Sequence, residues 1–514
     1  MVKQIDIVVS PEQAADKNTL HSIIADKVAV QVFEFKIIRR SIDARSKKIK
    51  VNLKIDVYIG ENIPVPEVFT RNYPSVKNRK HVAIAGCGPA GLFAALTLIE
   101  KGIKPVIFEQ GKNVRERRHD LAAINKNGIV NPESNYCFGE GGAGTYSDGK
   151  LYTRSDKRGN IKKVLETFVR FGADENILID AHPHIGTNKL PKIIEAMRNV
   201  ILNAGGEIHF STKITDIFVD GGEIKGVELN KTDLFPTDHL ILATGHSARD
   251  IFELLNERKI LIEAKPFALG IRIEHPQRLI DKMQYHCDDR GPYLPPSSYS
   301  MVQQINGRGV YSFCMCPGGI IAPCATAQDE VVTNGWSPSK RNNPFANSGF
   351  VVNIELNDLK QFEKYGALAG MYFQRDIEQK SFIAGGKNQS APAQRMVDFA
   401  NKKLSSDLPK CSYQPGIIST QLNDILPEFI YESLRLAFLA LKRSKPIYFT
   451  NEAVCVAVES RTSSPVRIPR NPDTLEHLHV KGLYPSAEGA GYAGGIVSAA
   501  MDGMRVAEQI EKSL

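Results

Sequence analysis

The chain has 514 residues and a formal net charge of +8, with 42% hydrophobic and 24% charged residues. This length allows about three domains, and the composition excludes a disordered chain, a collagen-like repeat and a small disulfide scaffold. Residues 1–80 hold 15 Lys and Arg against 9 Asp and Glu, so most of the positive charge lies in this N-terminal segment. The rest of the chain is close to neutral, which excludes a basic nucleic-acid-binding surface over the whole protein.

The first 75 residues are predicted to form a βαββ, ferredoxin-like unit. Strands are expected over 4–10, 32–38 and 49–59, and the apolar spacing over 19–30 indicates a helix. The Pro-containing stretch 61–80 is typical of a linker.

A doubly wound α/β pattern begins at residue 81. A short apolar strand, a glycine loop, a helix and a second strand follow one another over 81–109. A glycine-rich loop is expected over 122–150, followed by helices over 161–171 and 189–204. The next strands are expected as a β-meander and one buried strand, over 207–211, 214–219, 223–229 and 239–243.

The chain between 265 and 449 is rich in predicted strands, with Pro and Gly breaks between them. Helices are expected over 361–379, 392–404 and 427–443, and residues 482–514 indicate a short strand, a glycine loop and a final helix. We therefore predict three domains: an N-terminal unit of residues 1–75, an α/β domain of residues 80–264 and 450–514, and a substrate or cap domain of residues 265–449.

The eight cysteines are scattered and form no paired CxxC sets, which argues against a structural zinc site and favours reduced thiols in a cytoplasmic protein. The first residues have no apolar signal core. One stretch over 81–99 is apolar enough for a membrane span, but its Gly and Pro residues favour the strand, loop and helix described above. No membrane partner is expected.

The pattern G-x-G-x-x-G occurs three times, so context decides its meaning. The first copy has the full context, because it follows a strand, opens a helix and is followed by a second strand that ends at Glu109. There Gly86 allows a tight turn, Gly88 lets a pyrophosphate approach the backbone, and Gly91 lets helix and strand pack closely. The helix N-terminus attracts phosphates, and Glu109 stands near the spacing of a carboxylate that binds an adenosine ribose. This predicts a dinucleotide site and leaves FAD and NAD open.

The other two glycine patterns are interpreted differently. The second copy, Gly139/Gly141/Gly144, has no strong strand before it and suits a loop that wraps a flat ligand, with a surface loop as the alternative. The third copy, Gly489/Gly491/Gly494, leads into a helix over 496–510, whose N-terminus either stabilises charge on a ligand or is an ordinary glycine cap.

The first glycine loop resembles the flavoprotein superfamily of glutathione reductase and p-hydroxybenzoate hydroxylase, as do LILATG at 240–245 and LYPSAEG at 483–489. In the last string Glu488 replaces the superfamily's Asp. Longer strings resemble a bacterial family of uncharacterised FAD-dependent dehydrogenases, NAD(FAD)-utilising dehydrogenase-like and related to BaiN-like flavoproteins: GGAGTYSDGKL at 141–151, KPFALGIRIEHPQ at 265–277 and EGAGYAGGIVSAAMDG at 488–503.

The resemblance implies a Rossmann-like FAD-binding domain with an inserted α+β cap domain. No His or Cys stands out as an attachment point, so FAD is expected to bind without a covalent bond. The expected FAD contacts are Gly86, Gly88, Pro89, Ala90, Gly91, Glu109, Gln110, Gly141, Gly142, Ala143, Gly144, Thr145, Ile214, Ala243, Thr244, Gly245, Glu488, Gly489, Gly495 and Ile496.

Three residues are candidates for a catalytic role. Cys314 and Cys316, two apart on an expected strand, point to one face, and either act near the flavin or are buried apolar residues. Arg461 either clamps a carboxylate or pairs with Glu459 or another acid. No metal site is expected: His182 and His184 have no third ligand, and Thr187 is expected to cap the next helix.

The sequence predicts an oxidoreductase that moves hydride or electrons through FAD on an unidentified small molecule, with NAD(P)H as a possible transient donor. The alternative is a structural or redox-sensing FAD in a protein that binds RNA or a protein partner, or an FAD-dependent RNA-modifying enzyme. That alternative rests on the basic segment Arg39–Lys50, which lacks interleaved aromatic residues for base stacking. The oligomeric state stays open.

Overall fold

The computed structural model describes residues 1–64, 71–152 and 159–514, so the predicted linker over 61–80 lies partly outside the described residues. Its N-terminal unit has the predicted strand–helix–strand–strand order, in an antiparallel sheet of order β1-β3-β2. Ile5, Ile7 and Leu53 face Ile24 across its core. The elements are β1 (Val2–Val9), α1 (Pro11–Ala15), α2 (Lys17–Val28), β2 (Glu34–Asp43) and β3 (Lys50–Tyr58).

A parallel sheet of order β22-β10-β4-β5-β6 forms the second unit, so the chain has the mixed α/β fold that was predicted. Strand β6 belongs to this sheet and not to a meander, because it pairs in parallel with β5. The strands are β4 (His81–Ala85), β5 (Lys104–Phe108), β6 (Glu207–His209), β10 (Leu240–Leu242) and β22 (Leu483–Pro485). A separate antiparallel sheet follows β6: β7 (Ile214–Asp220), β8 (Glu223–Leu229) and β9 (Asp233–Pro236).

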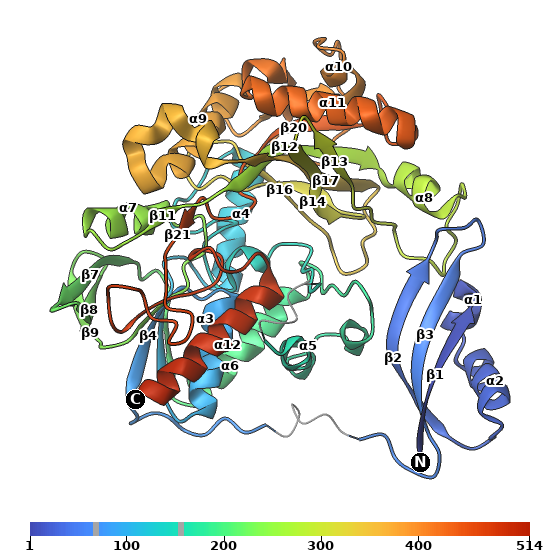
Figure 1. Ribbon diagram of the computed structural model, residues 1–514, viewed down its shortest axis with the longest axis horizontal. Coiled ribbons are helices and arrows are strands. Elements are labelled where there is room, and N and C mark those ends of the chain that lie inside the picture. The colour runs from blue at the N-terminus through green and yellow to red at the C-terminus, as the bar shows by residue number, and fades with distance from the viewer. Residues whose placement is uncertain (65–70, 153–158) are drawn as a thin grey trace.

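One face of the parallel sheet is covered by α3 (Pro89–Glu100), α5 (Ile161–Arg170), α6 (Leu190–Asn203) and α12 (Ile496–Ser513) (Figure 1). The other face packs against α7 (Arg249–Glu257) and the β7-β8-β9 sheet, and α4 (Val114–Asn127) packs against residues 322–332. Part of α4 lies where a loop was expected. Asn113 caps its first turn, and Gly128 ends the helix at φ 66°. The helix was not expected because its sequence is mostly polar and shows little apolar periodicity. Thr187 does not cap α6, because Lys189 holds that position without a side-chain hydrogen bond.

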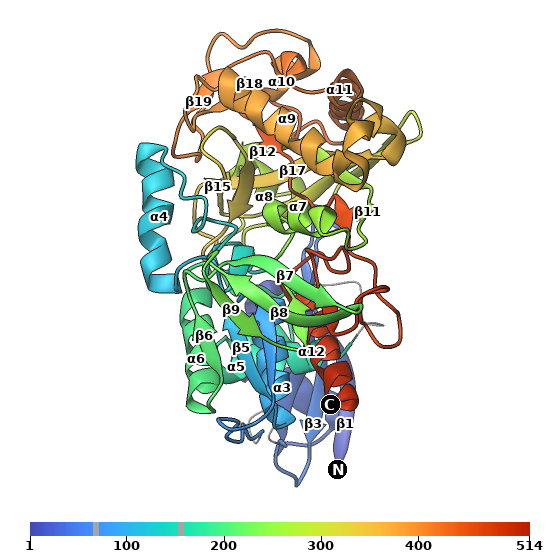
Figure 2. The same cartoon turned by 90° about the vertical axis from the view of Figure 1, so that its left-hand side faces the viewer.

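The third unit is a seven-stranded sheet of order β13-β14-β17-β12-β20-β18-β19. Strand β20 lies inside it, although residues 450–514 were assigned to the α/β domain. Helices α9, α10 and α11 cover the face that points away from the parallel sheet (Figures 1 and 2). The strands are β12 (Phe267–Pro276), β13 (Val302–Ile305), β14 (Arg308–Cys316), β17 (Phe345–Ile354), β18 (Ala391–Arg395), β19 (Ile417–Ser419) and β20 (Val454–Glu459).

Two helix predictions in this unit were wrong in detail. Residues 392–404 divide into β18 and a short α10, because Pro392 favours an extended chain and β18 pairs with β20. Residues 361–379 divide into a 3₁₀ segment and α9, with a break at Gly366, where φ is 55°. The helices are α8 (Gln277–Tyr285), α9 (Ala369–Ala384), α10 (Met396–Ala400) and α11 (Glu428–Ser444).

Short strand pairs and isolated β-bridges complete the fold, and one of these bridges links two units. The bridge joins the N-terminal unit to the loop after α5: the Arg40 amide donates to the Ile179 carbonyl at 2.7 Å, and the Ala181 amide donates to the Arg40 carbonyl at 2.9 Å. In the described ranges, no helix combines the length and apolar character that crossing a membrane requires. The remaining strands are β11 (Glu263–Ala264), β15 (Ile320–Pro323), β16 (Thr333–Trp336) and β21 (Val466–Arg467).

Candidate FAD site

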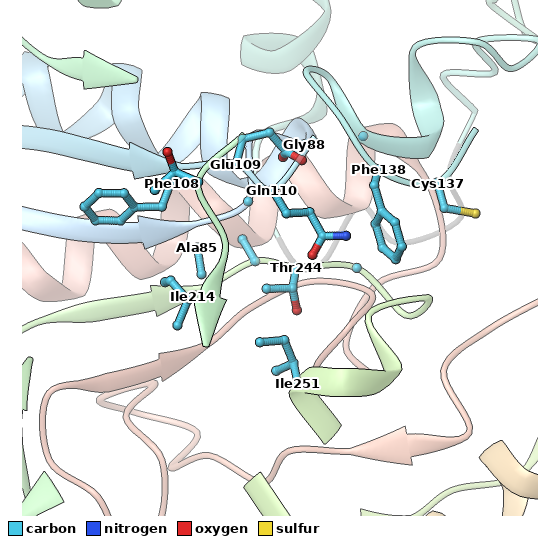
Figure 3. Close-up of a pocket in the computed structure, with 15 residues that line it drawn as sticks. Ala85, Gly88, Phe108, Glu109, Gln110, Cys137, Phe138, Ile214, Thr244 and Ile251 are labelled. Atoms are coloured by element: carbon cyan, nitrogen blue, oxygen red, sulfur yellow. The ribbon is translucent and has the colours of Figure 1, made fainter. Parts of the chain in front are cut away.

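A cavity of about 540 Å³, open to solvent, lies at the carboxyl ends of β4, β5 and β10. Figure 3 shows Phe108 and Cys137 at its opposite ends, with Gln110 extending into it. Of the expected FAD contacts, those that line it are Gly86, Gly88, Glu109, Gln110, Gly142, Ile214, Ala243, Thr244 and Gly245. The position agrees with the rule that open α/β sheets bind ligands beyond the carboxyl ends of their strands.

The three glycines of the first loop have different surroundings. A Cβ on Gly86 would lie 2.6 Å from the Ala243 carbonyl oxygen, and a Cβ on Gly91 would lie 2.1 Å from the Gly86 oxygen. A Cβ on Gly88 would meet only a Gly142 Cα, at 3.9 Å. Gly86 and Gly91 are therefore required by packing within the chain, whereas Gly88 keeps a surface open to a ligand.

Helix α3 begins directly on this surface. Gly88 is its N-cap and makes no side-chain hydrogen bond, and Pro89 occupies the first turn. The free N–H groups and the partial positive charge of this helix end therefore face the cavity that Gly88 lines. Such an arrangement binds phosphate groups.

Glu109 is buried and receives three backbone N–H groups. The amide of Cys87 donates to Oε2 at 2.8 Å, and the amides of Gly111 and Gly139 donate to Oε1 at 2.9 Å each. The carboxylate thus joins both glycine loops to the end of β5. The sequence pointed to Glu109 as a ribose ligand but not to these amides, because Gly139 is distant along the chain.

The second glycine loop is held by Arg117, a residue that the sequence did not single out. Its fully buried guanidinium donates to the carbonyl oxygens of Asn135, Tyr136, Glu140 and Gly142 at 2.7–3.0 Å. Burial lowers the pKa of Arg117. A hydrogen bond of 2.8 Å from the Gly141 amide to the Cys87 carbonyl then seats this loop on the first one. These hydrogen bonds therefore hold the second glycine loop in one conformation.

Several expected FAD contacts lie behind this loop rather than in the main cavity. An apolar space of about 290 Å³ is bordered by Pro89, Gly141, Gly144, Thr145 and Ile496. Ala143 is exposed at the tip of the loop. Ala90 is buried where α3 and α12 cross, since a Cβ on Gly503 would lie 2.1 Å from its oxygen.

The C-terminal glycine loop meets the turn after β10. A Cβ on Gly489 would lie 2.7 Å from the Gly245 oxygen, so these two backbones are in contact. Glu488 Oε2 lies 3.3 Å from Nδ1 of His246, and both side chains are partly exposed. Helix α12 then starts at Ile496, and its N-cap residue Gly495 has no side chain to cap it.

Asp502, on α12, holds the backbone just before Glu488 by accepting two hydrogen bonds. It accepts from the Ala487 amide at 2.7 Å and from the Ser486 hydroxyl at 3.2 Å. Arg470 closes the arrangement with a bidentate pair to the same carboxylate at 2.6 and 2.9 Å. The start of α12 and the strand β22 are thereby held in a defined relation, although neither Asp502 nor Arg470 was among the expected contacts.

These residues fit FAD. A Cβ would meet nothing within 4 Å at Gly245 and a single atom, at 3.9 Å, at Gly88, so the backbone leaves open space at two glycines that line the cavity. The start of α3, which has no side-chain cap, supplies N–H groups beside it. Among the described residues no cluster suited to a metal ion occurs. His184 instead pairs with the Ser339 carbonyl at 3.1 Å, and His182 packs edge-on against Tyr152.

Arg461 lies in a buried ion-pair network. Its guanidinium contacts Glu330 at 2.8 Å and Glu378 at 2.9 Å, and Arg249 pairs with the same two acids. Burial opposes ionisation of Glu378, but the two arginines outweigh it and lower its pKa to about 2. The sequence left Glu459 or another acid open as the partner of Arg461. The structure shows other acids, since Glu459 pairs with Arg272 at 2.9 Å. Arg461 therefore anchors the end of β20 to α7 and α9.

Cys314 and Cys316 end β14, but not in the expected regular strand. The pairing with β17 shifts register between Phe313 and Cys316, and Cys314 has φ 46°. Cys314 is half-buried and Cys316 is fully buried.

The comparisons with known proteins place the chain among FAD-dependent proteins. Residues 266–462 match the family described as "FAD-dependent protein, C-terminal domain-like", and residues 1–58 match "Domain of unknown function (DUF8436)". An uncharacterised protein of Clostridium beijerinckii is 38% identical over 520 residues, covering 96% of each chain.

Solved structures with a remote likeness include the tetracycline destructase Tet(51), with a TM-score of 0.35, 11% identity and coverage of 84% and 82% of the two chains. The flavin-dependent brominase Bmp2 has a TM-score of 0.37, 13% identity and coverage of 84% and 79%. Glycine oxidase from Bacillus cereus has a TM-score of 0.32, 14% identity and coverage of 85% and 96%. With TM-scores this low, these likenesses carry no weight for activity. The full-length match shows that the chain belongs to the family of the Clostridium beijerinckii protein, and within it residues 266–462 form a domain of the kind found in FAD-dependent proteins.

Proposed function

We propose that the protein is an oxidoreductase that transfers hydride or electrons through non-covalently bound FAD on a small-molecule substrate. The observation that carries this proposal is the convergence of three backbone segments on one open cavity: the loop at 86–88, the end of β5 at 109–110 and the turn at 243–245. The glycine at 489 extends this arrangement to the start of α12 through its contact with Gly245.

The residues have separable roles in this proposal. Gly88 and the first turn of α3 bind the pyrophosphate, and Glu109, held by three amides, presents Oε2 to a ribose hydroxyl. Glu488 and His246 orient the ribityl end, and the N-terminus of α12 stabilises negative charge near it. FAD itself supplies the reversible acceptance of two electrons.

NAD(P)H is proposed as a transient electron donor. The strand–loop–helix motif formed by β4, the first glycine loop and α3 lines the cavity assigned to FAD. A nicotinamide donor therefore has to approach the flavin from outside this cavity and leave again after transfer.

Anaerobic stopped-flow absorbance of the yellow holoprotein tests the proposal. We expect NADPH or NADH to bleach the flavin band rapidly, with dithionite as the control that defines full reduction. Bleaching by dithionite but not by either nucleotide would overturn the nicotinamide donor and leave the substrate itself as the source of electrons. A protein that is purified without flavin and does not take up added FAD would overturn the proposal as a whole.

A further inference from the structure

The end of β14 brings two thiols and two cations together. The Cys316 S–H has two acceptors within reach, the Cys314 carbonyl oxygen at 3.4 Å and the Cys314 sulfur. Arg272, fully buried on β12, donates from Nη2 to the Cys314 oxygen at 2.8 Å and lies 3.4 Å from the Cys316 sulfur. The ammonium of Lys150, from the end of the second glycine loop, donates to the Met315 carbonyl.

The backbone at this point is arranged for the two thiols to meet. A regular strand would hold side chains two apart in parallel, separated by the pleat. Here the left-handed φ of 46° at Cys314 and the register shift against β17 break that regularity. A non-glycine residue in this conformation costs about 1 kcal/mol or more, and such strain persists only where surrounding contacts impose it.

The electrostatics favour a thiolate at Cys314. The hydrogen bond from Cys316 lowers the pKa of Cys314 to about 5, and Lys150 and Arg272 act in the same direction. Burial raises the pKa of the thiols at Cys87, Cys324, Cys411 and Cys455. Charged groups around Cys314 come from the loop and two strands: Asp148, Lys150, Arg272 and Glu459.

We propose that Cys314 and Cys316 are a redox-active thiol pair that reduces a small hydroperoxide, with Cys314 as the attacking and Cys316 as the resolving residue. Cys314 is half-buried, which admits a peroxide more readily than a bulky disulfide, and Cys316 has no exposed surface. The adjacent guanidinium favours the charge of the attacking thiolate.

The reaction balances in two steps. The Cys314 thiolate attacks one peroxide oxygen, the O–O bond breaks, and the leaving oxygen departs as water or alcohol after taking a proton. The resulting sulfenic acid loses its hydroxyl as water when the Cys316 sulfur attacks, which forms the S–S bond. The two thiols supply both electrons, and the peroxide is reduced. Because the resulting ring is small and strained, an external thiol reverses the bond readily.

The test uses the intact holoprotein, reduced, desalted and treated with hydrogen peroxide. After digestion without reductant, we expect the tryptic peptide over 309–340 to lose the mass of two hydrogens and to regain it with dithiothreitol. This peptide also contains Cys324, so the loss must persist in Cys324→Ala. In Cys316→Ser, dimedone is expected to label Cys314, whereas in Cys314→Ser it leaves Cys316 unlabelled. An unchanged peptide mass in the wild type, or a loss that survives in Cys314→Ser, would overturn the proposal.

A second measurement separates a reactive thiol from a merely buried one. Iodoacetamide labelling of Cys314 is expected to be half-maximal well below the value of about 8.5 for an ordinary thiol, because the hydrogen bond from Cys316 and the nearby cations lower the pKa of Cys314. Lys150→Gln removes one nearby cation, and we expect the half-maximal pH of labelling to rise. Labelling of Cys314 that begins only above pH 8, in a protein that retains its flavin absorbance, would contradict the assignment without touching the proposed flavin chemistry.

Discussion

Substitutions at two glycines of the first loop are expected to affect cofactor binding and folding separately. Gly88 leaves open space, and Gly86 is packed against Ala243 at a φ of 99°. Gly88→Val is expected to lower FAD affinity by tenfold or more while the apoprotein unfolds at an unchanged temperature. Gly86→Val is expected to destabilise the apoprotein by about 2 kcal/mol or more, because it adds strain and a clash. Flavin fluorescence titration and thermal unfolding measure the two effects; equal loss of stability in both variants would contradict the distinction.

The buried carboxylate of Glu378 leads to a prediction about how protein stability depends on pH. Glu378 has its pKa lowered to about 2, so the stability that its ionised form contributes is present above its ordinary pKa of 4.5 and is lost as the pH falls toward 2. Glu378→Gln leaves Arg249 and Arg461 short of a partner and is expected to cost about 3 kcal/mol at pH 7. That difference should shrink below pH 4. Denaturant unfolding across this range, with the exposed Glu363→Gln as control, measures it.

The sequence could suggest the role of a single residue only where the groups that contact it are close along the chain. The roles of Gly86, Gly88 and Gly91 follow from a strand and a helix that directly flank them. The amides that hold Glu109 and the acids that hold Arg461 come from distant segments, and no local pattern reports them. For the same reason, the sequence offered Glu459 or another acid as the partner of Arg461 but could not point to Glu330 and Glu378.

At the scale of elements, α4 is predicted to control the second glycine loop. Arg117→Lys keeps the charge but offers a single ammonium where the guanidinium makes four hydrogen bonds, so the loop around 135–142 should loosen. We expect faster amide hydrogen exchange in this loop and weaker FAD binding. Arg115→Lys, on an exposed position of the same helix, is the matched control. Exchange that is unchanged in Arg117→Lys would show that the loop does not depend on this brace.

The elements that the sequence predicted best are short, apolar and bounded by glycine. Strands β4 and β5 and helix α3 follow one another in the order expected over 81–109, because their nearly complete burial gives each an uninterrupted apolar run. Helix α4 was missed because its exposed face is polar, and β6 was given to the wrong sheet because strand pairing is not a local property. The break in β14 at Cys314 likewise depends on the neighbouring β17.

For the whole molecule, the attachment of the N-terminal unit is open to test. Arg40 pairs with Asp180 at 2.7 Å, each about one-third exposed, beside two backbone hydrogen bonds. A pair this exposed contributes at most about 1 kcal/mol. Arg40→Ala is therefore expected to leave global stability almost unchanged but to speed amide exchange at residues 179–181. The control is Arg45→Ala, whose partner Asp43 lies within the unit. Release of the unit by limited proteolysis in Arg40→Ala alone would show that the side chain, not the backbone bridge, holds it.

The order of strands in the parallel sheet has a consequence for synthesis on the ribosome. Strand β22 pairs with β10 and is followed by α12, yet it is translated about 400 residues after β4, or roughly 20–80 s later. The N-terminal unit contains all its own strands and can fold soon after it emerges. The apolar edge of β10 has no neighbour until β22 arrives, so we expect chaperones to occupy the nascent chain during this interval and FAD to be captured only after translation is nearly complete.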